Sequence, residues 1–173
     1  SIANTVYVFA IDLNEVKSKE LYIYPSVEHM SRVGTNRGNY HDRQHLDIYM
    51  EAGSSFEIRQ TNANAENDLT LDCFNNDSHT EKMYTIPKSG EWVTISVDVD
   101  SVPFIRTLYN VTEKPQIEMR NFKGIQELNY YYYKDNEEVF FRKWNENNHQ
   151  YSVIESDRVT LLVPLKDRNN IVK

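Results

Sequence analysis

The sequence predicts a mainly β fold: an antiparallel β-sandwich, of the jelly-roll or galactose-binding-like type, followed by a short α/β segment. Two observations lead to this prediction. Short stretches with alternating apolar and polar residues recur along the first two thirds of the chain, with Asn, Asp, Ser and Gly between them. No helical period occurs before Asn121, whereas an amphipathic pattern follows Asp135. We therefore place a β-sandwich domain at residues 1–122, and a linker, helix and β-hairpin at residues 123–173.

The composition limits the classes of partner. A chain of 173 residues suffices for one sandwich-sized domain and part of another. The net charge of −7 argues against a nucleic-acid partner. No apolar run approaches the roughly 18 residues that a membrane span needs, and we find no signal-peptide pattern in this sequence. The single cysteine, Cys73, alternates with Leu69 and Leu71, so we expect it to be a small buried side chain.

The first strand is expected at residues 4–11, where both faces are apolar as in an interior strand. A second short strand is expected at residues 21–24, ended by Pro25. Residues 26–42 show no regular spacing of apolar residues, of either the strand or the helix type. Because this stretch contains several arginines and two glycines, we interpret it as a long exposed loop with a binding or docking role.

The strongest alternation lies at residues 46–50 and 56–60. In the first stretch, Leu46, Ile48 and Met50 point one way and Tyr49 points the other. Two arrangements fit this pattern. The two stretches could pair as a hairpin around Gly53, with Met50 opposite Phe56. Alternatively, the turn at Gly53 could carry the chain to an opposing sheet.

The remaining elements follow in order. Further strands are expected at residues 69–73, 83–86, 92–97, 101–106 and 116–120, and an extended aromatic stretch at 128–133. The presence of Pro103 predicts an edge or bulged strand, because proline cannot donate to a ladder. A helix is expected to begin at Asp135 with a capping box to Glu138. Strands at 151–154 and 158–163 would then begin a larger α/β domain.

The histidines provide no convincing catalytic or metal site. His41 and His45 have the i, i+4 spacing of zinc peptidases, but Asp42 and Arg43 follow the first histidine where a glutamate base is required. The segment also enters a strand rather than a helix. We therefore expect solvated loop histidines, no bound cofactor or metal in this chain, and no catalytic residue.

Aromatic and polar residues suggest carbohydrate binding instead. Sugar rings stack on Trp or Tyr while Asn, Asp and Arg bond their hydroxyl groups. In the alternative interpretation, the rings pack between the sandwich and the next domain. The parity of the 92–97 alternation places Trp92 on the outward side of its strand. The candidate binding residues are Arg37, Asp42, Arg43, Trp92, Tyr131 and Tyr133.

Several motifs, taken in order, resemble the N-terminal region of the enhancin-like, M60-type zinc metallopeptidases, close to the bacillus enhancin proteins. The matching pieces are residues 42–49 with Gly53, residues 56–60, 76–78, 84–87, 101–105 and 131–134, Phe140, Phe141, Trp144, residues 159–164 and Asp167. The resemblance implies a secreted or cell-surface protease that degrades mucin-type glycoproteins, with a β-sandwich ahead of its zinc-dependent catalytic domain. The family's His-Glu-x-x-His motif has no counterpart here, so no catalytic or zinc-binding position carries over.

Three functions are compatible with these observations. The first is an accessory region that positions a mucin-like glycoprotein or supports a catalytic domain further along the same chain. The second is a free-standing lectin-like module, and the third is a structural spacer or adhesin segment. In none of the three do we expect this fragment to be an enzyme.

Overall fold

The computed structural model describes residues 15–23, 43–109, 111–132, 137–147, 149–155 and 160–167. The strands are β1 (Lys17–Glu20), β2 (Arg43–His45), β3 (Ile48–Gln60), β4 (Leu69–Phe74), β5 (Lys82–Ile86), β6 (Val93–Ser96), β7 (Val102–Arg106), β8 (Gln116–Glu127), β9 (Tyr130–Tyr132), β10 (Tyr151–Glu155) and β11 (Thr160–Pro164). The helix α2 (Glu137–Asn147) lies between β9 and β10, and a short 3-10 helix (Leu165–Asp167) follows β11.

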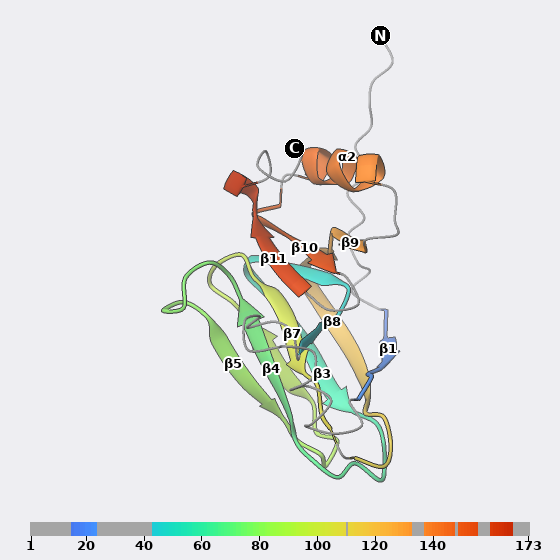
Figure 1. The fold of residues 1–173 in the computed structure, drawn as a ribbon. Helices are drawn as coiled ribbons and strands as arrows, with labels where there is room; N and C mark the ends of the chain where they lie inside the picture. The colour runs from blue at the N-terminus through green and yellow to red at the C-terminus, as the bar shows by residue number, and fades with distance from the viewer. Residues whose placement is uncertain are drawn as a thin grey trace.

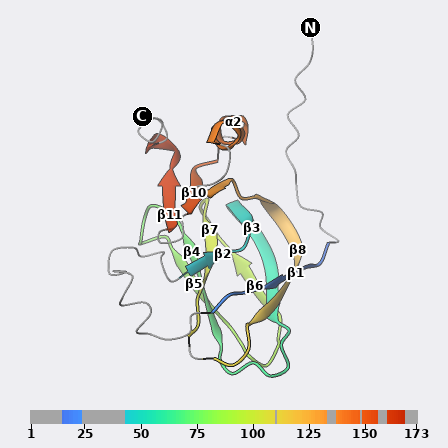
Figure 2. The ribbon, with the colours of Figure 1, turned by 45° about the vertical axis from the view of Figure 1, so that its right-hand side comes forward.

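The predicted sandwich is confirmed. One four-stranded sheet has the order β1-β8-β3-β6 and the other the order β2-β7-β4-β5, and all strand pairs in both sheets are antiparallel. We call them the β3 sheet and the β4 sheet. Figures 1 and 2 show that β9, α2, β10 and β11 gather at one end of this sandwich. The fold is therefore mainly β with a short α/β segment.

The alternation read from the sequence places the apolar residues in the core between the sheets. Phe56 and Ile58 of β3 and Leu69 and Leu71 of β4 are all fully buried. Cys73 belongs to the same cluster, and burial raises the pKa of its thiol to about 12. It is the buried small side chain that the pattern predicts.

Both arrangements predicted around Gly53 are wrong. β3 is a single strand of 13 residues, and it pairs with β8 on either side of a bulge between Met50 and Ser55. Gly53 lies in this bulge with a φ of 81°, a conformation that costs glycine little. The chain instead crosses between the sheets just before β3, where Asp47 has a φ of 63°.

The sequence predicts an edge or bulged strand around Pro103. The structure instead places β7 between β2 and β4, and its register against both strands is regular. Pro103 is opposite Cys73 of β4, whereas β2 pairs only with the last three residues of β7, from Phe104 to Arg106. Proline is tolerated because β7 has a paired strand on one side only at this position.

The first strand within the described residues is β1, which the sequence pattern missed, and residues 21–23 follow it without being a strand. Leu21 is nevertheless buried in the core. The side-chain amide of Gln44 takes the place of a neighbouring strand, since it accepts from the Tyr22 N–H and donates to the Tyr22 carbonyl at 3.1 Å each. The strand expected at 4–11 and the loop at 26–42 lie outside the described residues.

The C-terminal segment contains the predicted helix and hairpin. Its sheet has the order β11-β10-β9, with β10 antiparallel to β11 and parallel to β9. Phe140 and Trp144 on α2 pack with Val163 in a small core of their own. β8 continues through the predicted boundary between residues 122 and 123, and the division into two domains stays a prediction.

Candidate functional site

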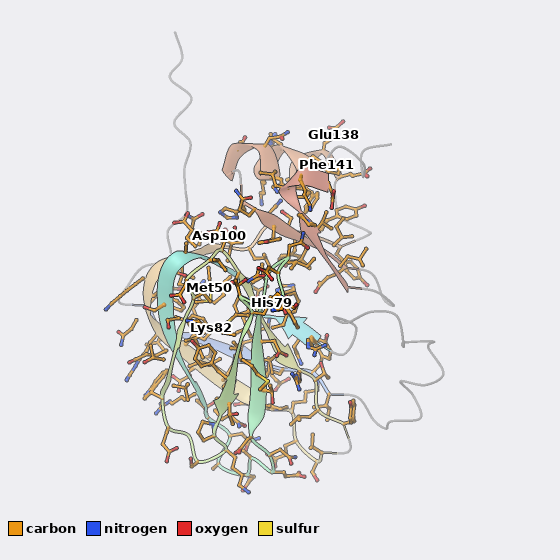
Figure 3. All side chains as sticks on the ribbon, turned by 90° about the vertical axis from the view of Figure 1, so that its left-hand side faces the viewer. Met50, His79, Lys82, Asp100, Glu138 and Phe141 are labelled. Atoms are coloured by element: carbon orange, nitrogen blue, oxygen red, sulfur yellow. The ribbon has the colours of Figure 1, made fainter. Side chains whose placement is uncertain are left out.

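The C-terminal segment contacts the sandwich through a group of aromatic and polar side chains, here called the junction: the buried Tyr49 and His149, the half-buried Asp100 and Gln126, and the exposed Gln150. The rings of Tyr49 and His149 stack with centroids 4.0 Å apart and planes 5° from parallel. The Tyr49 hydroxyl donates to Asp100 and accepts from the Gln150 N–H at 3.0 Å. Figure 3 shows Asp100 at the end of the sandwich nearest to the segment that contains Phe141. The two parts therefore form a single packed unit.

The sequence pattern placed Tyr49 on the outer side of its strand. The structure agrees on the direction, since Tyr49 packs in a second cluster with Phe74, Phe104 and Val153, separate from the central core. Tyr49 is nevertheless fully buried. Burial, followed by its hydrogen bond to Asp100, raises the pKa of its hydroxyl far above the usual value. The pattern shows which way a side chain points, but not that another part of the chain covers it.

His45 forms a second contact with the segment and is only 6% exposed, so the prediction of a solvated loop histidine is wrong for it. Its Nδ1 accepts from the Asp47 N–H at 3.0 Å, and its Nε2 lies 3.1 Å from Oε1 of Glu155 on β10. The ring also packs against Tyr130, with centroids 4.7 Å apart. His41 lies outside the described residues.

The contacts of His45 show whether it could be a zinc ligand. The family resemblance implies a zinc ion only in another part of a full-length protein. Both ring nitrogens of His45 are engaged by other groups, so the residues present do not fit a zinc site there. Within the described ranges, no group of three or more His, Cys, Asp or Glu could hold a metal ion. The expectations that this chain lacks a cofactor and is not an enzyme stay predictions.

Stability at the junction is expected to depend on pH through His149. Burial lowers the pKa of its imidazole to about 4, although the nearby Asp100 acts in the opposite direction. Its ordinary pKa is about 6.5. The unfolded chain therefore takes up the proton first as pH falls. Stability contributed by the neutral ring is fully present above about pH 6.5 and is lost towards pH 4, by roughly 3 kcal/mol.

The measurement is urea unfolding at pH 7 and pH 4.5 for the native chain and for His149→Phe. Phenylalanine keeps a ring against Tyr49 but does not titrate. The native chain should lose about 2–3 kcal/mol more than the variant on acidification. Equal losses in the two proteins would contradict this assignment, because carboxylates elsewhere titrate in both.

Trp92 points outward, as predicted, and lies in what we call the Trp92 surface: Glu57, Arg59, Trp92, Glu118, Arg120 and Asn121 on the outer face of the β3 sheet. The guanidinium carbon atoms of Arg59 and Arg120 lie 4.6 and 3.8 Å from the centre of the indole ring. Each arginine also pairs with a carboxylate, Arg59 with Glu118 at 2.9 Å and Arg120 with Glu57 at 2.6 Å. Glu57 has a lowered carboxyl pKa, chiefly through its bond to Arg120.

This surface offers an aromatic ring, charged groups and the Asn121 amide on a sheet face, which are the groups that bind sugars. The indole is already in contact with two guanidinium groups. A sugar could stack on it only where they leave the ring open or move aside. The binding role of Trp92 stays a prediction.

Arg43 begins β2 and is half-buried, rather than lying in an exposed loop. Its Nε donates to Oδ2 of Asp72 at 3.0 Å, and its guanidinium lies 5.1 Å from the Phe74 ring centre. Arg106 makes two further bonds to the same carboxylate, at 2.9 and 3.1 Å. Asp72 thus connects β2, β4 and β7, and Arg43 helps to hold the β4 sheet together.

Among the other candidates, Tyr131 is half-buried and packs against Phe140, with ring centroids 5.5 Å apart. Tyr131 thus packs within the small core of the C-terminal segment, and its binding role stays a prediction. Arg37, Asp42 and Tyr133 lie outside the described residues. The described candidates Arg43, Trp92 and Tyr131 come from three different parts of the fold, so the structure does not gather them into one site.

The comparisons with known proteins show the fold. No protein-family profile and no curated protein sequence matches the chain. The catalytic module of the metalloprotease ZmpA from Clostridium perfringens has a TM-score of 0.64 at 16% identity, over 92% of this chain and 37% of that one. The M60 catalytic domain of ZmpC from the same organism, solved with the sialyl T antigen, has a TM-score of 0.60 at 15% identity, over 91% and 36%.

A conserved protein of unknown function from Bacillus anthracis has a TM-score of 0.64 at 13% identity, over 88% of this chain and 31% of that one. The chain therefore spans about a third of the length of these structures. In addition, no helix among the described residues is long and apolar enough to cross a membrane. The chain has a fold that recurs in M60-like metallopeptidases.

Proposed function

We propose that this chain is a non-catalytic accessory region of a secreted or surface-exposed, enhancin-like metallopeptidase that acts on mucin-type glycoproteins. Its role is to position the glycoprotein or to support a catalytic domain of the same chain. The observation that carries the proposal is the extent of the structural match, which covers about 90% of the chain in metallopeptidases of low sequence identity. The match thus includes the sandwich together with the C-terminal segment.

The packing at the junction supports the same role. An accessory region can aim a substrate only if it is rigidly attached to the catalytic domain that it serves. Tyr49 of β3 is stacked on His149, and His45 at the end of β2 contacts Glu155 of β10. The buried cluster of Tyr49, Phe104 and Val153 adds apolar contacts between the same two parts. These contacts fix the direction in which the C-terminal segment leaves the sandwich.

Two measurements test the proposal. Reading the gene beyond the codon for Lys173 should reveal a His-Glu-x-x-His motif. The intact gene product should cleave an O-glycosylated mucin in the presence of zinc, whereas the 173-residue chain alone should not. Cleavage by the isolated chain, or a gene without this motif, would overturn the proposal.

The free-standing glycan-binding module is the second candidate, and the outward-facing Trp92 is the observation in its favour. A mucin pull-down with the isolated chain tests whether it binds glycans. Binding that falls at least about tenfold in Trp92→Ala, but not in the control Tyr22→Ala, would favour a glycan-binding surface. Tyr22 is a suitable control because it is 45% exposed and follows β1, at the opposite edge of the sheet from β6. If mucin retains none of the chain at high micromolar concentration, the glycan-binding function is excluded and only structural support of a catalytic domain is left.

A further inference from the structure

The strand β11 leaves one edge of the C-terminal sheet open. It pairs with β10 on one side, and no strand among the described residues pairs with its other side. Figure 1 shows β10 between β11 and β9. An open edge presents backbone N–H and C=O groups that can pair with a further strand. This edge is therefore a candidate interaction surface.

The register of the hairpin shows which backbone groups of β11 face the open edge. Just after the strand, the Leu165 N–H donates to the Gln150 carbonyl at 2.7 Å. Bonded and non-bonded pairs alternate along an antiparallel ladder, so Leu161 and Val163 also bond to β10. The N–H and the carbonyl of Leu162 therefore point away from β10, towards the open edge.

The side chains of β11 do not protect this edge. Native edge strands usually carry charged residues that prevent pairing with other strands, but the sequence of β11 is Thr-Leu-Leu-Val-Pro. Its proline, at the last position, removes only one donor. Leu161 is 47% exposed, and by alternation it lies on the same face as Val163, which packs with α2. Apolar surface thus continues along β11 from the small core to the solvent.

The edges of the sandwich, in contrast, are protected. Within the described ranges, three of its four edge strands carry charged residues, namely Lys17, Lys19 and Glu20 of β1, Arg43 of β2 and Lys82 of β5. The fourth edge strand, β6, is uncharged, but the Tyr84 hydroxyl binds its backbone. This hydroxyl donates to the Ser96 carbonyl at 2.7 Å and accepts from the Ser96 N–H at 3.3 Å.

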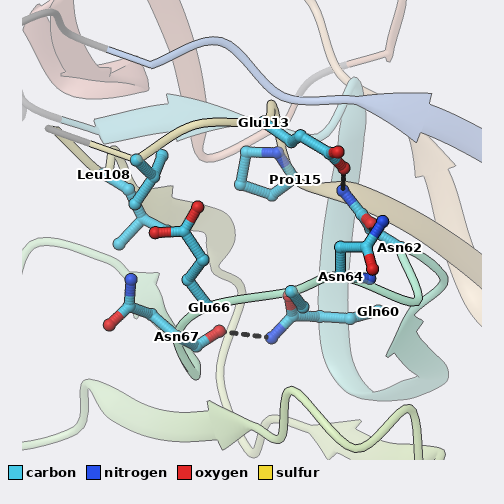
Figure 4. Close-up of a pocket in the computed structure, with 10 residues that line it drawn as sticks. Gln60, Asn62, Asn64, Glu66, Asn67, Leu108, Glu113 and Pro115 are labelled. Atoms are coloured by element: carbon cyan, nitrogen blue, oxygen red, sulfur yellow. Dashed lines mark hydrogen bonds between the residues drawn. The ribbon is translucent and has the colours of Figure 1, made fainter.

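Side chains also bind backbone groups at the end of the sandwich away from the junction. There the Gln60 amide donates to the carbonyl groups of Asn67 and Ile86 at 3.0 Å each, and Figure 4 shows the first of these bonds. The hollow next to Gln60 has a volume of about 10 Å³, enough for about one water molecule. The uncovered edge of β11 therefore differs from the edges and from this end of the sandwich.

We propose that the open edge of β11 pairs with a β-strand from the catalytic part of the same polypeptide, so that the C-terminal sheet continues into the catalytic domain. The pairing rests on the proposed function, which requires such a domain. The matching metallopeptidase structures cover about 90% of this chain, which spans only about a third of their length. Because Leu161 would lie beside the added strand, that strand should be uncharged and apolar on the face towards α2.

A second copy of the chain fits this edge less well. Five residues of strand extend about 17 Å, whereas a standard interface between proteins contains about 20–30 residues on each side. Each copy also has a net charge of −7, which opposes the association of two copies. A strand from the same polypeptide needs no such area, because its tether gives it an effective concentration in about the millimolar range.

Hydrogen exchange, measured for single residues by mass spectrometry, tests this pairing in the isolated chain and in the intact gene product. The Leu162 amide should exchange at least about 100-fold more slowly in the intact product, because the added strand accepts its hydrogen bond. The Val163 amide, which bonds to β10, should be protected in both proteins. Equally fast exchange of Leu162 in the two proteins would overturn the pairing. An isolated chain that sediments as a dimer, with Leu162 already protected, would also overturn it, since the edge would then bind a second copy.

Leu161→Lys places a charge at the open edge, and Met83→Lys is the matched control on the edge strand β5, where Met83 is 63% exposed. In the intact product, Leu161→Lys should speed the exchange of Leu162 at least about tenfold, whereas the control should not change it. Unchanged protection in Leu161→Lys would contradict a paired strand at this edge. A gene product without the His-Glu-x-x-His motif would overturn the proposed function. If the motif is present but Leu162 exchanges rapidly, only the pairing of β11 is overturned.

Discussion

Replacing Trp144 by alanine should destabilise the chain by about 3–5 kcal/mol. Trp144 is fully buried, and its indole N–H donates to the His149 carbonyl at 3.1 Å. The substitution removes the largest side chain of the small C-terminal core and leaves a cavity. It also removes a bond to the residue that stacks on Tyr49, so the damage should extend to the junction.

Urea unfolding measures this loss, with Phe141→Ala as the matched control. Phe141 lies on the same helix and contacts Trp144, with ring centroids 6.5 Å apart, but it is only half-buried. Its loss should therefore cost less, about 1–2 kcal/mol. If both variants lost the same stability, Trp144 would not be the centre of this small core. A separate early transition in Trp144→Ala would show that the segment unfolds before the sandwich.

The second large effect is expected from Asp72→Asn. Asp72 accepts hydrogen bonds from Arg43 and Arg106, and its side chain is only 10% exposed. Asparagine keeps the size but removes the charge, so two guanidinium groups would face a neutral amide in a partly buried position. Breaking such a pair by removing one charge costs about 3 kcal/mol, the lower end of the usual range because the Arg106 side chain is 43% exposed.

The control for Asp72 is Asp98→Asn. Asp98 pairs with Lys82 at 3.1 Å, but its side chain is 87% exposed. Solvent screening should keep the effect of this substitution within about 0.5 kcal/mol. A small loss for Asp72→Asn, similar to that of the control, would show that the arginines find other partners and that the carboxylate is not central to the β4 sheet.

The sequence by itself determined the character of most strands and of the helix. Alternation predicted β4, β5 and β6 and the burial of Cys73, and the 3–4 residue spacing of Phe140, Phe141 and Trp144 predicted α2. These features depend on neighbours along the chain, since a half-buried strand or helix must repeat its apolar residues with the period of its backbone. The outward direction of Trp92 followed from the same parity.

Only the tertiary structure decided what covers each face. His45 was expected to meet solvent, and alternation pointed Tyr49 away from the core between the sheets, yet both are buried because the C-terminal segment packs over them. Gly53 could have been a turn, but a bulge keeps β3 continuous because β8 pairs with it on both sides. Periodicity fixes the direction of a side chain, whereas burial and pairing depend on residues distant in sequence. Contacts between residues that are distant in sequence produce no periodic pattern along the chain, so the sequence alone does not predict them.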